Sequence, residues 1–484
     1  LAGNCSTMSH LKALHAAFVV QGLHGDASAA GKLVASVCRR GDLAYASRLF
    51  DHVGSSSIAA WNALIGAYSR SSKPESVVRY FRLMARGEGG VRPDCYTLNF
   101  VILACGFARW FGLGRQLHGW VCKNGSFVSD SHVPTSVVRL YSRCGEMGDA
   151  RKVFDEIPDP DLVQWNVVID GYVKMGLENE ALTVFRDMLV LQVEPDAFCV
   201  TTALKACALS GALRQGRWIH EYVKQKGMLE ADVFVGTALV DMYAKCGCVA
   251  LAEEVFEKMP RRNVFSWAAV IGGYAVYGHA REALSCLEKM QAVDGLKPDG
   301  VVILGVLMAC THAGLLEEGR ALMDVMERRF GVVPRHEHYS CVVDLLCRAG
   351  RLEDALELVR KMPMRPLASV WGAFLNGCRI HKNIELAKLA FKELMQLVKG
   401  DKAEEEAALV QLSNTYLSAG RSEDASRIRR SIGEKGLNKM VVGCSMIEVD
   451  GIVNEFVSGD ASHKHIAEIH TTLSLLFPGD GDVT

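Results

Sequence analysis

Histidine and cysteine are the side chains in this sequence that could bind a metal and activate water. The 484-residue chain contains 15 His and 16 Cys residues. A zinc site of the nucleobase-deaminase kind needs a His followed two residues later by Glu, together with a Cys-x-x-Cys pair. No His in the sequence has Glu at that spacing, and no Cys-x-x-Cys occurs. We therefore expect no metal, no cofactor and no enzymatic activity of the chain itself.

Two local clusters resemble metal sites and are better explained otherwise. His336-Glu337-His338 alternates across the start of one predicted helix, so we expect exposed surface there. Cys246 and Cys248 flank Gly247 at a predicted turn. Most cysteines fall on apolar helix faces, where a free Cys behaves as a small hydrophobic residue, and this pattern favours a reducing compartment.

Small polar side chains recur in pairs that are 26 to 32 residues apart. An Asn amide offers donors and an acceptor, a Thr hydroxyl offers either, and an Asp carboxylate only accepts, so different pairs present different hydrogen-bonding edges. One such residue alone is explained by helix capping, but capping does not explain six polar pairs in one register. The pairs are Asn62 with Asp94, Asn99 with Asp130, Thr135 with Asp161, Asn166 with Asp196, Thr201 with Asp232, and Thr237 with Asn263.

Basic side chains recur near the end of a predicted helix in the same register, and Val276 interrupts the series. The net charge is −1, so any nucleic-acid binding must come from a local stripe of positive charge. Such a column suits successive phosphates. Compensation of the helix dipole is the alternative. The residues are Arg39, Arg70, Arg143, Lys174, Lys245 and Arg348.

These residues are positioned by a repeated helical hairpin, of which Leu162 to Asp196 is one copy. Apolar residues recur at helical spacing in both halves of this copy, Gly176 is placed to end the first helix, and Pro195 closes the second. Trp61, Trp165 and Trp267 recur every 102 to 104 residues. This period consists of three hairpins of about 35, 36 and 31 residues, and such self-similarity is the signature of a solenoid.

The period divides the chain into consecutive parts. Residues 1–26 are a truncated repeat, and residues 27–366 hold ten repeats in a constant order of three types. The hydrophobic content of 49% excludes wholesale disorder. The longest uncharged run, 300–316, fits the register of its repeat and is expected to be a buried helix rather than a membrane span. Repeats that start at the Trp signature begin at 58, 162 and 264, the short ones at 27, 131, 233 and 336, and the third type at 95, 197 and 300.

Several motifs resemble those of plant pentatricopeptide-repeat (PPR) proteins. They include Pro-Asp at the ends of repeats, ARKVFDEIP at 150–158 and ALVDMYAKCG at 238–247. The alternating lengths resemble the subgroup built from P, L and S motifs. Residues 367–437 resemble that subgroup's two E motifs, and 438–484 its E+ extension, although Val442 and Met446 stand where Pro and Trp are usual.

The resemblance implies an all-α fold, a right-handed superhelical α-solenoid of helix-turn-helix hairpins. It also implies that each polar pair reads one base of single-stranded RNA, that the basic column binds phosphates, and that the second residue of each repeat wedges between bases. Core packing is the equal alternative for that second residue. The residues concerned are Ala59, Val163, Phe198, Phe234, Phe265 and Val301.

The function implied is the specification of cytidine-to-uridine editing sites in transcripts of a mitochondrion or chloroplast. The implied partners are the RNA, a DYW-type deaminase acting in trans and multiple organellar RNA editing factors, with no membrane. No transit peptide is visible in the sequence. A splicing or transcript-stability factor is one alternative, and a peptide-binding scaffold of the tetratricopeptide kind is another.

Overall fold

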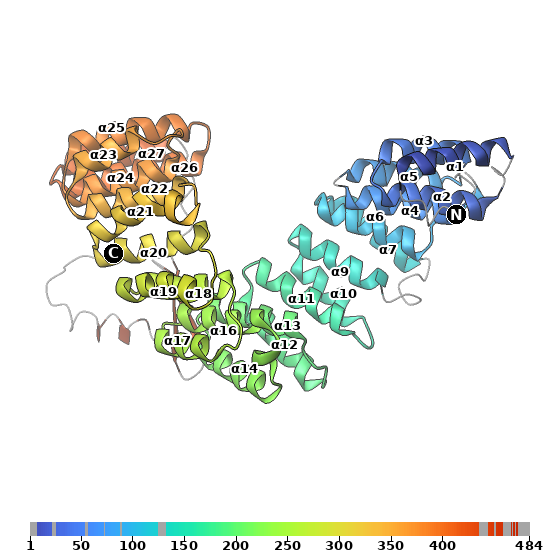
Figure 1. The fold of residues 1–484 in the computed structure, drawn as a ribbon, viewed down its shortest axis with the longest axis horizontal. Helices are drawn as coiled ribbons and strands as arrows, with labels where there is room; N and C mark the ends of the chain where they lie inside the picture. The colour runs from blue at the N-terminus through green and yellow to red at the C-terminus, as the bar shows by residue number, and fades with distance from the viewer. Residues whose placement is uncertain are drawn as a thin grey trace. The chain divides into compact units, whose positions relative to one another are not determined.

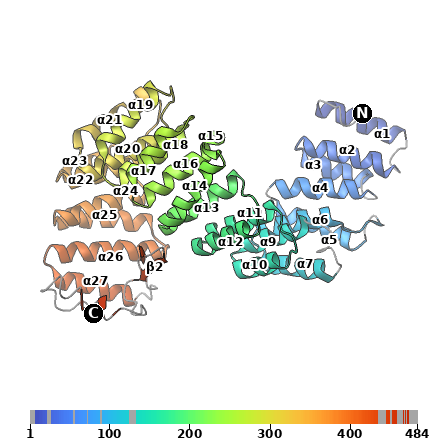
Figure 2. The ribbon, with the colours of Figure 1, turned by 90° about the horizontal axis from the view of Figure 1, so that it is seen from below.

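The structure is a computed structural model of the chain (Figures 1 and 2). It describes residues 7–21, 26–53, 57–71, 73–87, 90–123, 132–434, 444–449 and 452–457, together with 466, 468–469 and 471–472. The chain forms two compact bodies, an N-terminal body of Leu1–Ala206 and a C-terminal body of Cys207–Thr484. Each body is described by itself.

The N-terminal body is a row of antiparallel helical hairpins. After α1 (Met8–Val20), each hairpin has a first helix of 13 residues and a second helix of 9 to 13 residues. The first and second helices of each pair are α2 (Ala27–Arg39) with α3 (Leu43–Val53), α4 (Ile58–Arg70) with α5 (Pro74–Ala85), α6 (Cys95–Phe107) with α7 (Phe111–Lys123), α9 (His132–Cys144) with α10 (Met147–Asp155), and α11 (Leu162–Lys174) with α12 (Glu178–Val190). Helix α13 (Ala197–Ser210) runs across the border between the bodies.

The C-terminal body continues the same pattern. It begins with α14 (Leu213–Gln225) and the short α15 (Met228–Ala231). Its pairs are α16 (Val233–Lys245) with α17 (Val249–Lys258), α18 (Val264–Val276) with α19 (Ala280–Ala292), α20 (Gly300–Ala313) with α21 (Leu316–Phe330), α22 (His336–Arg348) with α23 (Leu352–Arg360), α24 (Ala368–Ile380) with α25 (Ile384–Leu397), and α26 (Lys402–Ser418) with α27 (Ser422–Glu434). The predicted α-solenoid of helical hairpins is confirmed.

One element departs from the all-α prediction. β1 (Cys444–Val449) and β2 (Ile452–Val457) form an antiparallel pair, in which Val449 lies opposite Ile452. The sequence between them is Asp450-Gly451, a dipeptide typical of two-residue hairpin turns. This strand pair was not predicted from the sequence.

Helix starts and ends follow from local chemistry. Asp161 accepts from the backbone N–H of Gln164 at 2.9 Å, and the Gln164 side chain accepts from the Asp161 N–H at 2.8 Å. This reciprocal capping box satisfies two N–H groups at the start of α11. Gly176 has φ +71°, which confirms the predicted left-handed residue after α11.

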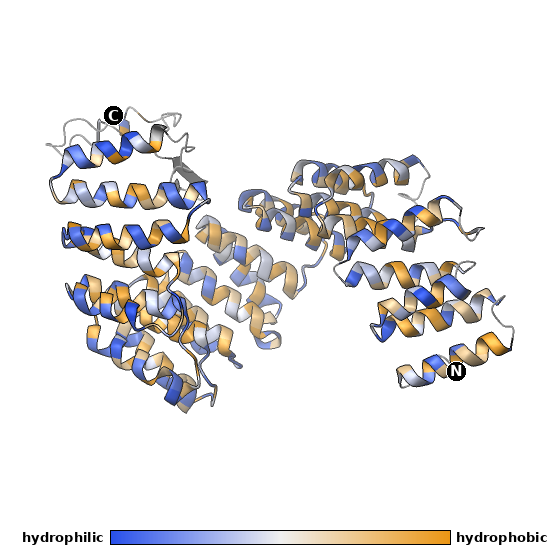
Figure 3. Ribbon diagram, turned by 90° about the horizontal axis from the view of Figure 1, so that it is seen from above, coloured by the Kyte–Doolittle hydropathy of each residue, from blue (hydrophilic) through white to orange (hydrophobic). Residues whose placement is uncertain are grey.

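The recurring Trp joins each hairpin of this type to the hairpin before it. Trp165 on α11 is buried and meets Phe154 on α10 edge to face, with ring centroids 4.7 Å apart. The same contact recurs at 4.5 Å between Trp61 and Phe50, and at 4.6 Å between Trp267 and Phe256. The sequence period therefore repeats one interface. Figure 3 shows that hydrophobic and hydrophilic residues are mixed along the helices.

The run 300–316 is interrupted structurally as well as in sequence. Helix α20 ends at Ala313, and Gly314 has φ +70°. Within the described part of the chain, no helix combines the length and the apolar character needed to cross a membrane. Among the described residues, the cysteines of this core are free thiols.

A second recurring contact requires glycine. A Cβ at Gly114 on α7 would lie 2.6 Å from Cδ2 of the buried Leu140 on α9. Gly216 faces Met242 and Gly319 faces Leu345 in the same register. Glycine at these sites lets the second helix of one hairpin approach the first helix of the next closely.

We expect Gly114→Ala to destabilise the α7–α9 interface by roughly 1 to 3 kcal/mol through overpacking, which exceeds the gain of about 0.5 to 1 kcal/mol in helix propensity. Gly119→Ala is the matched control, because a Cβ there meets nothing within 4 Å. It should stabilise α7. Native-state hydrogen exchange of the α7 and α9 amides measures both changes locally. Equal protection in the two variants would contradict the close approach.

Candidate nucleic-acid interface

The first helices of successive hairpins pack side by side, so equivalent residues form columns. In the N-terminal body the series is α2, α4, α6, α9 and α11, and in the C-terminal body it is α16, α18, α20, α22, α24 and α26. Numbered from the first residue of each repeat, the second residue, the fifth residue and the thirteenth residue each occupy a constant place on these helices. Three columns of side chains result within each body.

The second-residue column is exposed, which decides between the two interpretations of it. Phe198, Phe234 and Phe265 are 52%, 58% and 64% exposed. Val163, Val301 and Ala59 are also exposed. Core packing is therefore wrong for these six residues. Because exposed aromatic and branched side chains at a regular spacing offer flat apolar surfaces, planar rings can stack between them.

Tyr96 belongs to the same column, although it was not among the residues predicted from the sequence. Its side chain is 63% exposed on the first turn of α6. The signal was available, because Tyr96 is the second residue of the repeat that starts at 95.

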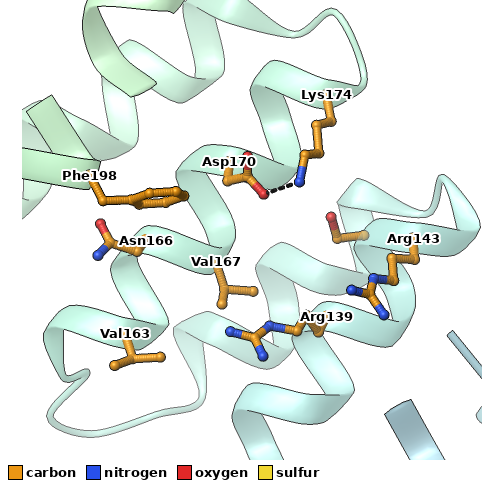
Figure 4. A pocket seen from close by; sticks show the side chains of 9 residues that line it. Arg139, Arg143, Val163, Asn166, Val167, Asp170, Lys174 and Phe198 are labelled. Carbon is orange, nitrogen blue, oxygen red and sulfur yellow. Dashed lines mark hydrogen bonds and ion pairs between the residues drawn. The ribbon is translucent and has the colours of Figure 1, made fainter. Parts of the chain in front are cut away.

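A groove of about 260 Å³ shows how the columns combine (Figure 4). Asn166 lies between Val163 and Phe198, which come from successive repeats. Arg143 from α9 and Lys174 from α11 line the same groove. The groove thus holds two apolar walls, one amide and basic side chains, which are the contacts that a single base and its phosphate require.

Two of the predicted polar pairs are hydrogen-bonded. Asn62 Nδ2 donates to both carboxylate oxygens of Asp94 at 3.0 Å. Asn166 Nδ2 donates to both oxygens of Asp196 at 3.2 Å. A carboxylate only accepts, so it fixes the amide with nitrogen toward itself and oxygen away.

The last residue of each described pair also caps the next helix. Asp94 accepts from the N–H of Thr97 at 2.8 Å, and Asp196 accepts from the N–H of Cys199 at 2.8 Å. Asp161, Asp232 and Asn263 cap α11, α16 and α18 in the same way. All five residues therefore cap helices, and Asp94 and Asp196 also accept hydrogen bonds from Asn62 and Asn166.

The other members of the pairs have the following neighbours. The hydroxyls of Thr237 and Thr201 donate to the carbonyls of Val233 at 2.8 Å and Phe198 at 2.9 Å. Thr201 and Asp232 fall in different bodies. Thr135 is half-buried on α9, and Asn99 Oδ1 accepts from the Ser136 hydroxyl. Asp130 lies outside the described residues.

The basic column lies in the last turn of the first helices, and three of its six residues form ion pairs with an Asp of the same helix. Lys174 pairs with Asp170 at 2.6 Å, Lys245 with Asp241 at 2.8 Å, and Arg348 with Asp344 at 2.8 Å. These acids were not predicted from the sequence, although each stands four residues before its basic partner. Exposed pairs of this kind contribute about 0 to 1 kcal/mol, so a phosphate can displace the carboxylate.

The other basic residues have different neighbours. The guanidinium of Arg143 lies 3.6 Å from the ring centroid of Phe107. Burial and the nearby charge of Arg139 lower the pKa of Arg143, while Asp170 opposes the shift. Arg39 donates to the Ser36 hydroxyl at 3.0 Å, and Arg70 occupies the last turn of α4. An anion beside Arg139 and Arg143 would relieve their mutual repulsion.

The structure corrects the expectation for His336 and His338. His338 is 2% exposed: its Nδ1 accepts from the N–H of Arg335 at 3.0 Å, and its Nε2 lies 2.9 Å from the carbonyl of Gly300. It is a core residue that caps α22, rather than exposed surface. His336 is half-buried, and its Nε2 lies 3.0 Å from the carbonyl oxygen of Arg365. Over the described ranges, no group of three or more His, Cys, Asp or Glu could hold a metal ion.

Family models match along most of this architecture. The PPR repeat family model matches residues 160–208, and the E motif model matches 381–448. PPR repeat models match residues 330–363, 59–87, 133–159, 237–264 and 265–293.

Curated relatives extend the similarity to nearly the whole chain. A putative pentatricopeptide repeat-containing protein of Arabidopsis thaliana is 55% identical over 477 residues, which are 98% of this chain and 94% of that protein. A second Arabidopsis thaliana relative, described as chloroplastic/mitochondrial, is 37% identical over 98% of this chain and 76% of its own length.

Solved structures share the fold. The crystal structure of the pentatricopeptide repeat protein PPR10 in complex with an 18-nt psaJ RNA element has a TM-score of 0.68 at 16% identity. The match covers 86% of this chain and 62% of PPR10, so the chain spans less than two thirds of that protein. The structure of PPR10 from maize has a TM-score of 0.54. The repeat models, the E motif and the near full-length relatives together show that this chain belongs to the pentatricopeptide-repeat family.

Proposed function

We propose that this protein binds single-stranded RNA in a sequence-specific manner and specifies a site of cytidine-to-uridine editing in organellar transcripts. The observation that carries RNA binding is the groove at Asn166, where an amide held by Asp196 lies between two exposed apolar side chains and beside Arg143. The PPR10 complex supports it, since that protein of the same fold binds RNA.

In this proposal each repeat handles one nucleotide. The base stacks between the second residues of successive repeats, such as Val163 and Phe198, and stacking contributes about 1 to 3 kcal/mol per base. The polar pair contacts the Watson–Crick edge of the base. The basic column binds the phosphates and sets the strand in register.

The Asn–Asp pairs have a physical reason to favour uracil. Asp196 holds the nitrogen of the Asn166 amide, so the oxygen, which is buried and unpaired in the free protein, is the atom left for a base that displaces its cover. An oxygen accepts the N3–H of uracil, whereas N3 of cytosine is itself an acceptor. This supports the family's rule that Asn with Asp favours U.

With the repeats running 5′ to 3′ from N- to C-terminus, the order of bases follows from the family's pairing rules. From Asn62 to Asn263 the pairs favour U, a pyrimidine, G, U, a weak G and then A. Ala268, Leu304 and Ser340 leave the next three bases unassigned. The edited cytidine lies a short fixed distance 3′ of this stretch.

The assignment to editing rests on the E motif. We assign 1–26 to a truncated repeat, 27–366 to ten repeats, 367–437 to two E motifs and 438–484 to the E+ extension. The extension recruits a DYW-type deaminase and other editing factors in trans, because the sequence lacks the zinc motif that deamination requires. Relatives named chloroplastic/mitochondrial and mitochondrial support an organellar location.

Thr135→Asn should change the base preferred at the third position of the site from G to U. The change leaves Asp161 in place and converts the third pair into an Asn–Asp pair. Mismatches at nucleic-acid interfaces cost about 1 to 3 kcal/mol, which competition between RNAs that differ only at this base can measure. Thr135→Ser keeps the hydroxyl and should keep the preference for G. An unchanged ratio of G to U binding in Thr135→Asn would show that Thr135 is only a helix-start residue.

Lys174→Ala should weaken binding to all RNA sequences alike and lower the slope of log affinity against log salt by about 0.7, the value for one phosphate on a single strand. The matched control is Lys152→Ala. Lys152 also pairs with an acid, Asp149 at 3.1 Å, but lies on α10 and outside the basic column. If both variants changed the slope equally, the column would have no special role.

Deleting residues 367–484 should leave RNA affinity nearly unchanged and abolish editing. The reason is that the variable polar pairs lie before residue 367, whereas the E region is the recruiting part. Sequencing organellar transcripts in a loss-of-function plant identifies the edited site and separates editing from splicing. Complementation with the full chain or the deletion then measures the effect. Restored editing with the deletion, or lost RNA binding by it, contradicts the assignment.

A further inference from the structure

Asn62 and Asn166 share three features and differ at the residue that follows the paired carboxylate by three positions. Each is the fifth residue of its repeat, each donates to the last-residue carboxylate, and each repeat has a Met in the same register, Met84 or Met188. Three residues after the carboxylate stands Thr97 in the first case and Cys199 in the second. Both of these side chains are fully buried.

The hydroxyl of Thr97 reaches the oxygen that the proposed function assigns to the base. Its Oγ1 lies 2.6 Å from Asn62 Oδ1 and 2.9 Å from Asp94 Oδ1. The hydroxyl has one hydrogen to give. Asp94 Oδ1 already accepts from the Thr97 N–H and from Asn62 Nδ2. The hydrogen therefore goes to Asn62 Oδ1, the nearer acceptor.

The oxygen of Asn166 has no such donor. It is buried and has no hydrogen-bond partner among the described residues. The thiol of Cys199 lies 3.6 Å from Met188 Sδ. Asn99 lies outside this comparison, because the hydroxyl that its Oδ1 accepts from belongs to Ser136, which stands six residues after Asp130 rather than three. A buried acceptor without a partner is costly, so a ligand that supplies a donor gains what the free protein lacks.

We propose that the residue three positions after the last-residue carboxylate sets how strongly an Asn–Asp pair distinguishes uracil from cytosine. A hydroxyl there already satisfies the amide oxygen and reduces the gain from uracil N3–H. A thiol leaves the oxygen unpaired, so the hydrogen bond from uracil N3–H contributes its full free energy to binding. Thr97 and Cys199 are thus positioning residues for Asn62 and Asn166. This inference rests on the proposed base-reading function.

The test is an exchange of the two residues in the full chain, Cys199→Thr and Thr97→Cys. Four RNAs of the predicted site, with U or C at the first base or at the fourth base, compete for each variant. We expect the parent to prefer U over C more strongly at the fourth base than at the first. Cys199→Thr should lower the ratio at the fourth base by on the order of tenfold and leave the first unchanged. Thr97→Cys should raise the ratio at the first base only.

Thr97→Ser and Cys199→Ser keep the test informative if an exchange variant unfolds, which thermal melts would show. Thr97→Ser retains the hydroxyl and should match the parent, whereas Cys199→Ser supplies a hydroxyl and should behave as Cys199→Thr. A parent without preference for U at either base overturns the proposed base reading together with this inference. A parent that prefers U at both bases, with ratios that the exchanges do not move, overturns the inference alone.

Discussion

Apolar side chains on both flat sides of each hairpin are the constraint on which this structure depends. A single hairpin cannot bury both sides itself, so its stability comes from the neighbours on either side. The contacts that achieve this are specific: the Trp165 ring against Phe154, and Gly114 against Leu140. Because the same contacts recur, successive first helices lie in a constant register, and the columns of exposed side chains follow from it.

The columns explain how a nearly neutral chain can present a surface for a polyanion. The acids that balance the charge stand next to the bases they balance, as Asp170 stands beside Lys174. Such exposed pairs hold each other weakly in water. A phosphate can therefore replace the carboxylate as the partner of the cation at little cost, because the released carboxylate is then hydrated by solvent.

Much of the fold could be predicted because residues of distinctive type recur at the same place in successive repeats. Trp, Gly and the closing Pro-Asp mark hairpins wherever they fall, and the apolar stripes between them have helical spacing. The exposure of Phe198 could not be predicted, because an aromatic residue at helical spacing can face either a neighbouring helix or solvent. The prediction that His338 is exposed was wrong for a related reason: the side chain packs against the carbonyl of Gly300, which stands 38 residues earlier in the chain. The strand pair at 444–457 was missed because those residues lie beyond the last helical repeat, where the period carries no information about secondary structure.

The carboxylate of Asp196 performs two tasks with one side chain. It accepts the N–H of Cys199 at the start of α13 and it holds the amide of Asn166. The first task accepts only a few residue types, chiefly Asp, Asn, Ser and Thr. A substitution at this position to a residue outside that set would cost the start of α13 about 0.5 to 2 kcal/mol. Under the proposed base reading, the chemistry of helix starts therefore limits which last residues a pair can use, and so which bases can be reached by a single substitution.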